Sequence, residues 1–227
     1  MLHFLGFILL VTSAVMALPI PVALLLAEGH LIPYFLFPAL ASAVAGLLLR
    51  LKFKPKELSL GDAMVLVTFT WILMSFFSSI PYVFGNHMSF IDAYFESMSG
   101  FTATGLTMVQ GPPGAPPHTP LWEVCPKTIL FWRSLTEWVG GMGVIVLFLA
   151  ALLGAGKAAR KMYTAEARAE QIEPSIRGTA RSLWRIYVLL TILGALGLYF
   201  AGMPIFDSIN HSMTGIATGG FSVRNTS

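Results

Sequence analysis

Two stretches of sequence decide the fold: DAYFESMSGFTATGLT at Asp92–Thr107 and DSINHSMTGIATGGFS at Asp207–Ser222. Aligned without a gap at an offset of 115 residues, they share five of sixteen residues, at positions 92/207, 97/212, 98/213, 100/215 and 105/220. Each stretch follows a long apolar run and ends in Gly- and Thr-rich chain. The pattern predicts a unit of span, short helix, Gly/Thr-rich loop and span that occurs twice, the second copy stopping before its last span.

The composition places this unit in a membrane. Of the 227 residues, 56% are hydrophobic and only 11% are charged, whereas soluble chains carry about 25% charged residues. The high apolar content excludes a disordered chain, and the single cysteine, Cys125, excludes a disulfide-rich secreted scaffold. The net charge of +3 does not indicate a nucleic-acid partner, because most basic residues fall in two short segments.

Those basic segments also predict the topology. Of the fourteen Lys and Arg residues, four lie at Arg50–Lys56 and seven at Lys157–Arg185, while Gly85–Pro126 has none. Short cytoplasmic loops of membrane proteins collect basic residues, so we expect a cytoplasmic N-terminus and an outside finish. A span needs about 20 apolar residues. Five segments meet that need: Phe4–Ala27, Leu31–Leu51, Leu60–Phe84, Thr128–Leu153 and Leu183–Gly202. We read the first as a true span, kinked or ended by Pro19 and Pro21, rather than as a signal peptide.

The outside section between the third and fourth spans is expected to re-enter the membrane. Ser89–Gly100 is helix-like but too short to span, and Ser89 and Asp92 have the spacing of a helix cap. Gly- and Thr-rich chain follows it, and non-helical backbone at membrane depth is tolerated only where protein buries it or water reaches it. The Pro-rich segment 111–120 is expected to be an extended outer loop.

The repeated unit suits the passage of a cation. The C-terminal end of a short helix carries partial negative charge, and glycine lets successive carbonyls point the same way. Rings of carbonyls replace the hydration shell of potassium in selective filters. The competing interpretation is that the glycines only permit close helix packing. The predicted filter comprises Thr102, Ala103, Thr104, Gly105, Leu106, Ala217, Thr218, Gly219, Gly220 and Phe221, with K⁺ held by Thr102, Thr104, Gly105, Thr218, Gly219 and Gly220.

At these residues the chain resembles the N-terminal half of the TrkH/TrkG/KtrB superfamily of potassium-transporting membrane subunits. The resemblance is carried by YFESMSGFTATGLT, LFWRSLTEWVGGMGVIVL (Leu130–Leu147), ARSLWRIYVLLTI (Ala180–Ile192) and GIATGGFS. It implies an all-α integral membrane fold of span–pore-helix–span repeats, preceded by an extra N-terminal helix pair. We expect the helix pair at 1–57, the first repeat at 58–156, a cytosolic amphipathic connector at 157–181 and the second repeat at 182–227, truncated after its filter loop.

The resemblance also implies a function and partners. One filter glycine per repeat goes with potassium selectivity in this family, which maps onto Gly105 and Gly220 and favours K⁺ over Na⁺. The implied setting is the bacterial inner membrane, with pairing of two chains and a cytosolic nucleotide-binding subunit of the TrkA/KtrA type. The connector would meet that subunit, or it is simply a solvated helix near anionic lipid. The chain itself has no P-loop or G-x-G-x-x-G, so we expect no cofactor in it and nucleotide control only through the partner.

The family fold needs four repeats, and this chain holds fewer than two. We therefore expect either truncation of a longer chain, which we favour, or assembly of several copies. The alternatives to potassium uptake are a non-conducting fragment or structural membrane subunit and, less favoured, an intramembrane enzyme using Glu137. The enzyme is disfavoured because no nucleophile–base or metal constellation accompanies that residue.

Several charged residues outside the loops are weighed as well. Arg133 and Glu137 lie four apart on one helix face at membrane depth, so they either pair with each other or take part in the ion pathway. Asp92, Glu96 and Asp207 lie on or near short-helix starts, where they cap the helices or attract cations to the pore mouth. No histidine pair has a recognised metal-ligand spacing, and Cys125 is expected to be an inert thiol.

Overall fold

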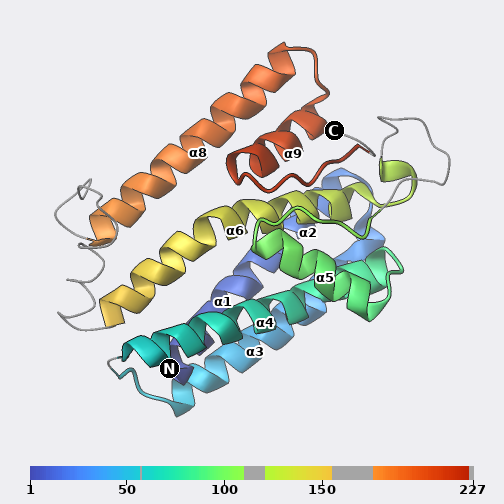
Figure 1. Ribbon diagram of the computed structural model, residues 1–227. Helices are drawn as coiled ribbons and strands as arrows, with labels where there is room; N and C mark the ends of the chain where they lie inside the picture. The colour runs from blue at the N-terminus through green and yellow to red at the C-terminus, as the bar shows by residue number, and fades with distance from the viewer. Residues whose placement is uncertain (57, 110–120, 155–175, 225–227) are drawn as a thin grey trace.

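The computed structural model describes residues 1–56, 58–109, 121–154 and 176–224, and within these ranges the chain is helical, with no extended strand. Long helices lie side by side, and two short helices, α5 and α9, lie near one end of them (Figure 1). The α-helices are α1 (Leu2–Ala17), α2 (Pro19–Leu25), α3 (Ile32–Lys52), α4 (Leu60–Gly85), α5 (Phe90–Phe101), α6 (Lys127–Gly154), α8 (Ile176–Phe200) and α9 (Ile205–Ile216). Two 3₁₀ turns, η1 (Gly29–Leu31) and η2 (Leu121–Glu123), precede α3 and α6.

Four helical segments of the described residues are long and apolar enough to cross a membrane. They are Leu2–Leu25, Gly29–Lys52, Gly61–Gly85 and Arg181–Phe200, and they match four of the five predicted spans. The fifth predicted span coincides with α6, which has 28 residues and, at 1.5 Å per residue, is about 42 Å long. The Pro-rich segment 111–120 and most of the expected connector, 155–175, lie outside the described residues. Residues 176–181 already belong to α8, so the helix begins before the expected start of the span.

Local sequence accounts for several helix ends. Pro19 begins α2 directly after Leu18, so the first span is a pair of helices broken at the predicted proline. At the start of α4, Ser59 and Asp62 form a capping box, in which each side chain bonds the other residue's backbone N–H. Ser89 caps α5 in a related way, since its hydroxyl accepts from the N–H of Asp92 at 3.2 Å and donates to the Asp92 carboxylate at 2.7 Å. The predicted cap of the short helix is therefore present.

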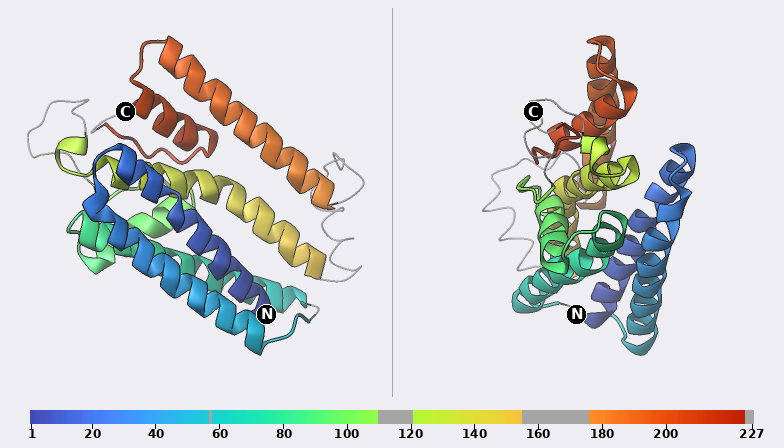
Figure 2. Two further views of the ribbon diagram at one scale, coloured as in Figure 1. Left: turned by 180° about the vertical axis from the view of Figure 1, so that it is seen from behind. Right: turned by 90° about the vertical axis from the view of Figure 1, so that its right-hand side faces the viewer.

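The N-terminal helices α1 and α3 form a closely packed pair along one flank (Figure 2). A Cβ added at Gly6 would lie 2.6 Å from the carbonyl oxygen of Gly46, and one at Gly46 would lie 2.7 Å from that of Gly6. Ser42 donates from its hydroxyl to the carbonyl oxygen of Leu9 at 2.7 Å. Small residues and hydroxyl bonds of this kind are what hold helices together where lipid removes the hydrophobic driving force.

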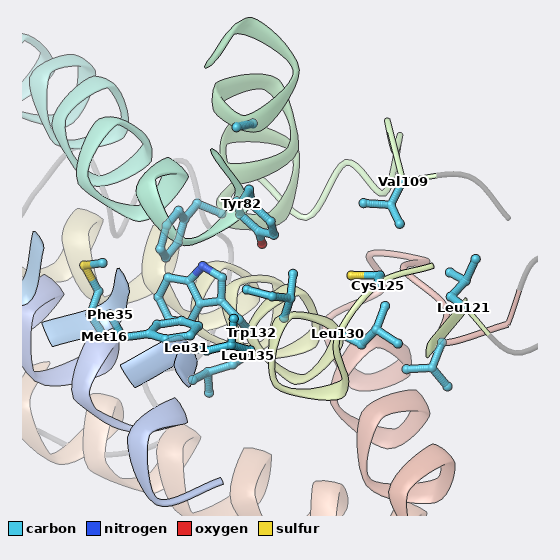
Figure 3. Packing of buried hydrophobic residues seen from close by; sticks show 14 of the residues in the cluster. Met16, Leu31, Phe35, Tyr82, Val109, Leu121, Cys125, Leu130, Trp132 and Leu135 are labelled. Atoms are coloured by element: carbon cyan, nitrogen blue, oxygen red, sulfur yellow. The ribbon is translucent and has the colours of Figure 1, made fainter. Parts of the chain in front are cut away.

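Helix α6 is the centre of the structure, because it contacts α4, α5, α8 and α9. Its Trp132 is fully buried and lies among side chains from the N-terminal helices and α4, including Phe35 and Tyr82 (Figure 3). The indole N–H of Trp132 donates to the carbonyl oxygen of Ser78 at 3.2 Å. This packing fixes the rotation of α6, and the same helix then presents Arg133 and Glu137 to the two Gly/Thr-rich loops.

Candidate functional site

The chain that follows each short helix folds in the same way. We call residues 102–109 the first loop and residues 217–224 the second loop. The N–H of Thr104 donates to the carbonyl oxygen of Ser99 at 2.9 Å, and the N–H of Gly219 donates to that of Thr214 at 3.1 Å. Ala103 and Thr218 are both left-handed, with φ of 50° and 54°. A left-handed residue with such a bond is a Schellman-type helix end, and each pair obeys the 115-residue offset of the sequence alignment.

The two aligned glycines share an unusual backbone. Gly105 has φ of 77° and Gly220 has φ of 104°, a region that residues with a side chain rarely adopt. A Cβ added at Gly105 would overlap the carbonyl oxygen of Gly219, whereas one at Gly220 would meet nothing within 4 Å. The loops therefore touch at Gly105 and Gly219, and Gly220 faces open space.

The first loop is held mainly by its own short helix. The Glu96 carboxylate accepts from the Thr107 hydroxyl, at 2.9 and 3.0 Å, and from the backbone N–H of Met108 at 2.7 Å. The Ser99 hydroxyl donates to the carbonyl oxygen of Leu106 at 2.6 Å. Both supporting side chains come from α5, so this short helix and its loop form a largely self-contained unit.

The second loop is held instead by α6, a helix of the first repeat. The backbone N–H of Phe221 donates to both carboxylate oxygens of Glu137 at 3.1 Å. Gly219 lies against the same carboxylate, since a Cβ there would overlap it. Glu137 is fully buried and forms no salt bridge among the described residues. In α9 the position equivalent to Glu96 is His211, so the second short helix offers no carboxylate at this position.

Arg133 joins the two loops. Its guanidinium donates to Glu96 at 2.6 Å, to the Thr107 hydroxyl at 2.8 Å and to the carbonyl oxygen of Ser222 at 2.9 Å. It also lies over the ring of Phe221, 4.4 Å from the centroid. Thr107 and Ser222 are equivalent positions of the repeat, so one side chain of α6 binds both loops at the same place. Arg133 is 1% exposed, and its hydrogen bonds and the Glu96 partner offset the cost of burying its charge.

The predicted pairing of Arg133 with Glu137 is wrong. Their spacing on α6 permits it, but Glu96 of the neighbouring helix binds the guanidinium, and the Glu137 carboxylate binds loop backbone. The choice depends on how α5 and the second loop approach α6, which helical spacing alone does not reveal.

The three outer acids have different environments. Asp92 lies in the first turn of α5, where its carboxylate accepts from the hydroxyl of the capping residue, Ser89. Glu96 is fully buried and paired with Arg133, so it is not an acid at a pore mouth. Asp207 is 2% exposed and forms an ion pair with Arg224 near the end of the second loop, with an Nε–Oδ2 distance of 2.8 Å. The capping interpretation thus fits Asp92, and the other two carboxylates fasten loops.

The predicted filter side chains do not share one environment. The Thr102 hydroxyl donates to the carbonyl oxygen of Met98 at 2.8 Å and lies 2.7 Å from the hydroxyl of Thr104. Leu106 is 62% exposed, whereas its equivalent Phe221 is 2% exposed and packed beneath Arg133. What the loops have in common is their backbone, including the left-handed residues at 103/218 and 105/220.

Sequence reasoning missed the residues that fasten the loops. Ser99, Thr107 and Ser222 were not singled out as functional, although Thr107 and Ser222 end the aligned stretches as a hydroxyl pair. That pairing was the available signal. Arg133, which binds the Thr107 hydroxyl and the backbone carbonyl oxygen of Ser222, is 26 residues from Thr107 and 89 from Ser222, so only the folded chain brings these groups together.

Comparison with known proteins now decides the family. The sequence profile of the family described as TrkH, cation transport protein, matches residues 34–227. The chain belongs to the TrkH family. The resemblance carried by the two loops is thereby confirmed. TrkH proteins are transporters, so the alternative of an intramembrane enzyme using Glu137 is set aside.

Individual relatives match the chain along all or nearly all of its length. It is 40% identical over all of its residues to a protein of Methanocaldococcus jannaschii described as an uncharacterized cation transporter, covering 46% of that protein. It is 35% identical to the Trk system potassium uptake protein TrkH of Escherichia coli strain K12, over 98% of this chain and 45% of that protein. The crystal structure of the potassium transporter TrkH from Vibrio parahaemolyticus superposes with a TM-score of 0.78 at 33% identity, covering 99% of this chain and 44% of that one. The chain therefore spans about half the length of the TrkH relatives it matches.

A resident metal finds no support in the described part of this TrkH chain. No group of three or more His, Cys, Asp or Glu side chains that could hold a metal ion gathers there. The acidic side chains at the loops bind Arg133, Arg224 or backbone N–H groups instead.

Proposed function

We propose that this chain takes part in potassium uptake across the plasma membrane, along a path built partly from residues 102–106 and 217–221, as part of a Trk-type system. One observation carries the proposal. Gly105 and Gly220 occupy equivalent left-handed positions in two loops that touch each other. Relatives that match the chain over nearly its whole length are named as Trk potassium uptake proteins, which supports potassium as the cargo.

The chemistry rests on the backbone. Both short helices end at the loops, so the partial negative charge of each C-terminal end lies near the proposed path. Left-handed residues at 103/218 and 105/220 allow carbonyls to face a common axis, where they replace the hydration shell of K⁺. The proposed ligands are backbone and hydroxyl oxygens of Thr102, Thr104, Gly105, Thr218, Gly219 and Gly220.

Two loops supply only part of a ring around an ion. The proposal therefore includes further loops, either from a longer chain or from other copies of this one. It also includes an N-terminus on the cytoplasmic side, a pair of chains, and a cytosolic nucleotide-binding subunit of the TrkA/KtrA type. Co-purification of such a subunit with the membrane protein, in the presence of nucleotide, tests the last of these.

The test of transport uses bacterial cells that lack their own potassium uptake systems. The chain is expressed alone and, in parallel, joined to the second half of the Methanocaldococcus jannaschii relative, because the matched relatives are about twice as long. Uptake of Rb⁺ by K⁺-starved cells is measured with and without competing Na⁺. We expect Rb⁺ uptake that Na⁺ inhibits weakly, and stronger Na⁺ inhibition in Gly105→Ser and Gly220→Ser at equal protein levels.

A control substitution must add a side chain without touching either loop or the short helix that precedes it. Gly197 in α8 meets this need, because a Cβ there meets nothing within 4 Å. Gly194 does not, because a Cβ there would lie 2.7 Å from the hydroxyl of Ser212 on α9. Gly197→Ser should keep the wild-type preference. If both loop substitutions also keep it at normal expression, the loops are not the filter.

A further inference from the structure

The peptide bond between Gly220 and Phe221 has a defined orientation. Its N–H, on Phe221, points at the buried carboxylate of Glu137. The described residues contain no cis peptide bond, and in a trans peptide the N–H and C=O lie in one plane and point in opposite directions. The carbonyl of Gly220 is therefore turned away from Glu137 and from the body of α6.

The surroundings of the two residues agree with this orientation. Phe221 is 2% exposed and packed under Arg133, whereas Gly220 is exposed and has open space where a side chain would be. The Gly220 carbonyl thus emerges on the open side of the loop, and the carboxylate lies on the buried side. Gly219 has no side chain to hold the carboxylate away, since a Cβ there would overlap Glu137.

No other side chain of the described residues binds this N–H. Arg133, one turn earlier on α6, takes the next carbonyl, that of Ser222. In the first loop, the residue equivalent to Phe221 is Leu106. There the hydroxyl of Ser99 donates to the carbonyl oxygen of Leu106 rather than accepting from its N–H. Among the described residues, the one side-chain hydrogen bond to the 220–221 peptide thus comes from the carboxylate of Glu137.

We propose that Glu137 is the positioning residue that sets the K⁺ over Na⁺ preference of the second loop, by holding the N–H of Phe221 so that the Gly220 carbonyl faces the ion path. The inference rests on the proposed function of the loops. In this proposal, the position of the acceptor oxygen of Glu137 sets the preference, and its negative charge does not. Position and charge can be separated, because glutamine keeps the reach without the charge and aspartate keeps the charge without the reach.

The experiment compares Glu137→Gln and Glu137→Asp in the Rb⁺ uptake assay with Na⁺ competition, using both forms of the chain described above. Membrane protein levels are measured for each variant and used to normalise uptake. Glu137→Gln should keep the wild-type preference within about twofold. Glu137→Asp should lose about tenfold of it, the scale of one hydrogen bond to a charged group. A structural role alone would change protein level or total uptake without changing the preference.

The outcomes separate the alternatives. If Glu137→Asp keeps the K⁺ over Na⁺ preference and Glu137→Gln loses it, the negative charge is what acts, and the proposal is overturned. The proposal is also overturned if neither variant changes the preference. If Glu137→Asp is absent from the membrane, Glu137→Met replaces it, because methionine has similar reach without carboxylate oxygens, and the same loss is expected. Loss of preference in Glu137→Gln at normal level overturns the proposal by itself. If wild type shows no preference, or Gly220→Ser changes none, the proposed function fails and the role of Glu137 falls with it; if those two controls behave as expected and only the Glu137 variants do not, the role of Glu137 alone is overturned.

Discussion

The two loops have the same backbone but different supports. The first is fastened by Glu96 and Ser99 from the short helix that precedes it. The second has His211 at the position of Glu96 and is fastened by Glu137 from a helix of the other repeat. The comparison shows that the repeat preserves the course of the chain, not the contacts that stabilise it. Among the described side chains, Arg133 is the one that hydrogen-bonds both loops, through the Thr107 hydroxyl in the first and the Ser222 carbonyl oxygen in the second.

The largest effect is expected where the two loops depend on one residue. Arg133→Met leaves Glu96 buried without its partner, and breaking a buried pair in this way costs about 3–5 kcal/mol. Thermal unfolding of purified protein in detergent should show a large drop in midpoint, whereas Arg181→Met, at an exposed arginine of α8, should show little change. The double variant Arg133→Met/Glu96→Gln should recover part of the loss, because neither charge remains. A double variant as unstable as the sum of the two single changes would mean that the unpaired charge is not the cause.

The two loop glycines should differ in their effect on stability. Gly105→Ala combines a left-handed backbone with overlap on the carbonyl of Gly219, for a loss of about 2–4 kcal/mol. Gly220→Ala strains the left-handed backbone in the same way, but its Cβ enters open space, so we expect a loss of about 1–2 kcal/mol of stability. The difference in unfolding midpoint measures the contact between the loops. Equal losses would show that the first loop does not lie against Gly219.

A smaller effect is expected from the matched glycines of the short helices. A Cβ at Gly100 would overlap the hydroxyl of Thr136 on α6 and lie 3.3 Å from the Phe221 ring, while one at Gly215 would meet nothing. Gly100→Ala should therefore lose about 1–3 kcal/mol of stability. Gly215→Ala should lose none, and a helical alanine can gain up to about 1 kcal/mol. Unfolding of the 227-residue chain in detergent checks both. A loss at Gly215 equal to that at Gly100 would remove the asymmetry between the two short helices.

The last prediction leaves function unchanged and tests whether the section between α5 and α6 lies outside and the basic segment after α3 lies inside. A cysteine replacing Glu123 should react with an impermeant thiol reagent from outside, and one replacing Lys54 only from inside, because basic loops are cytoplasmic. Native Cys125 gives little background: it is 1% exposed, and burial raises its pKa to about 12. Its reactive thiolate is therefore scarce at neutral pH and becomes abundant only as the pH approaches that value. Labelling of both new cysteines from one side would contradict the topology.

Much of the backbone could be predicted from sequence because the repeat is local information. The 115-residue offset pairs Ala103 with Thr218 and Gly105 with Gly220, and each pair has the same left-handed conformation. The Ser89 cap of α5 and the break of the first span at Pro19 follow from residue types that favour those positions. These features depend on a few neighbouring residues, which a sequence displays directly.

The contacts of the charged residues could not be predicted in the same way. Spacing along α6 suggested Arg133 with Glu137, because residues four apart in a helix are neighbours. The observed partner, Glu96, is 37 residues away on another helix. Which carboxylate binds the guanidinium depends on the rotation of α6, and the burial of Trp132 among three other elements sets that rotation. The partner of Arg133 is therefore determined by the packing of several elements and not by the sequence of any single segment.

Because α6 holds the second loop, the order of the residues along the chain also bears on biogenesis. A ribosome adds residues from the N-terminus onward, and earlier segments can fold before later ones emerge. Arg133 and Glu137 are made some eighty residues before Phe221 and Ser222. The surface that shapes the second loop thus enters the membrane before that loop exists. The second loop can therefore fold onto a surface that is already in place, which makes the direction of translation part of how the site is assembled.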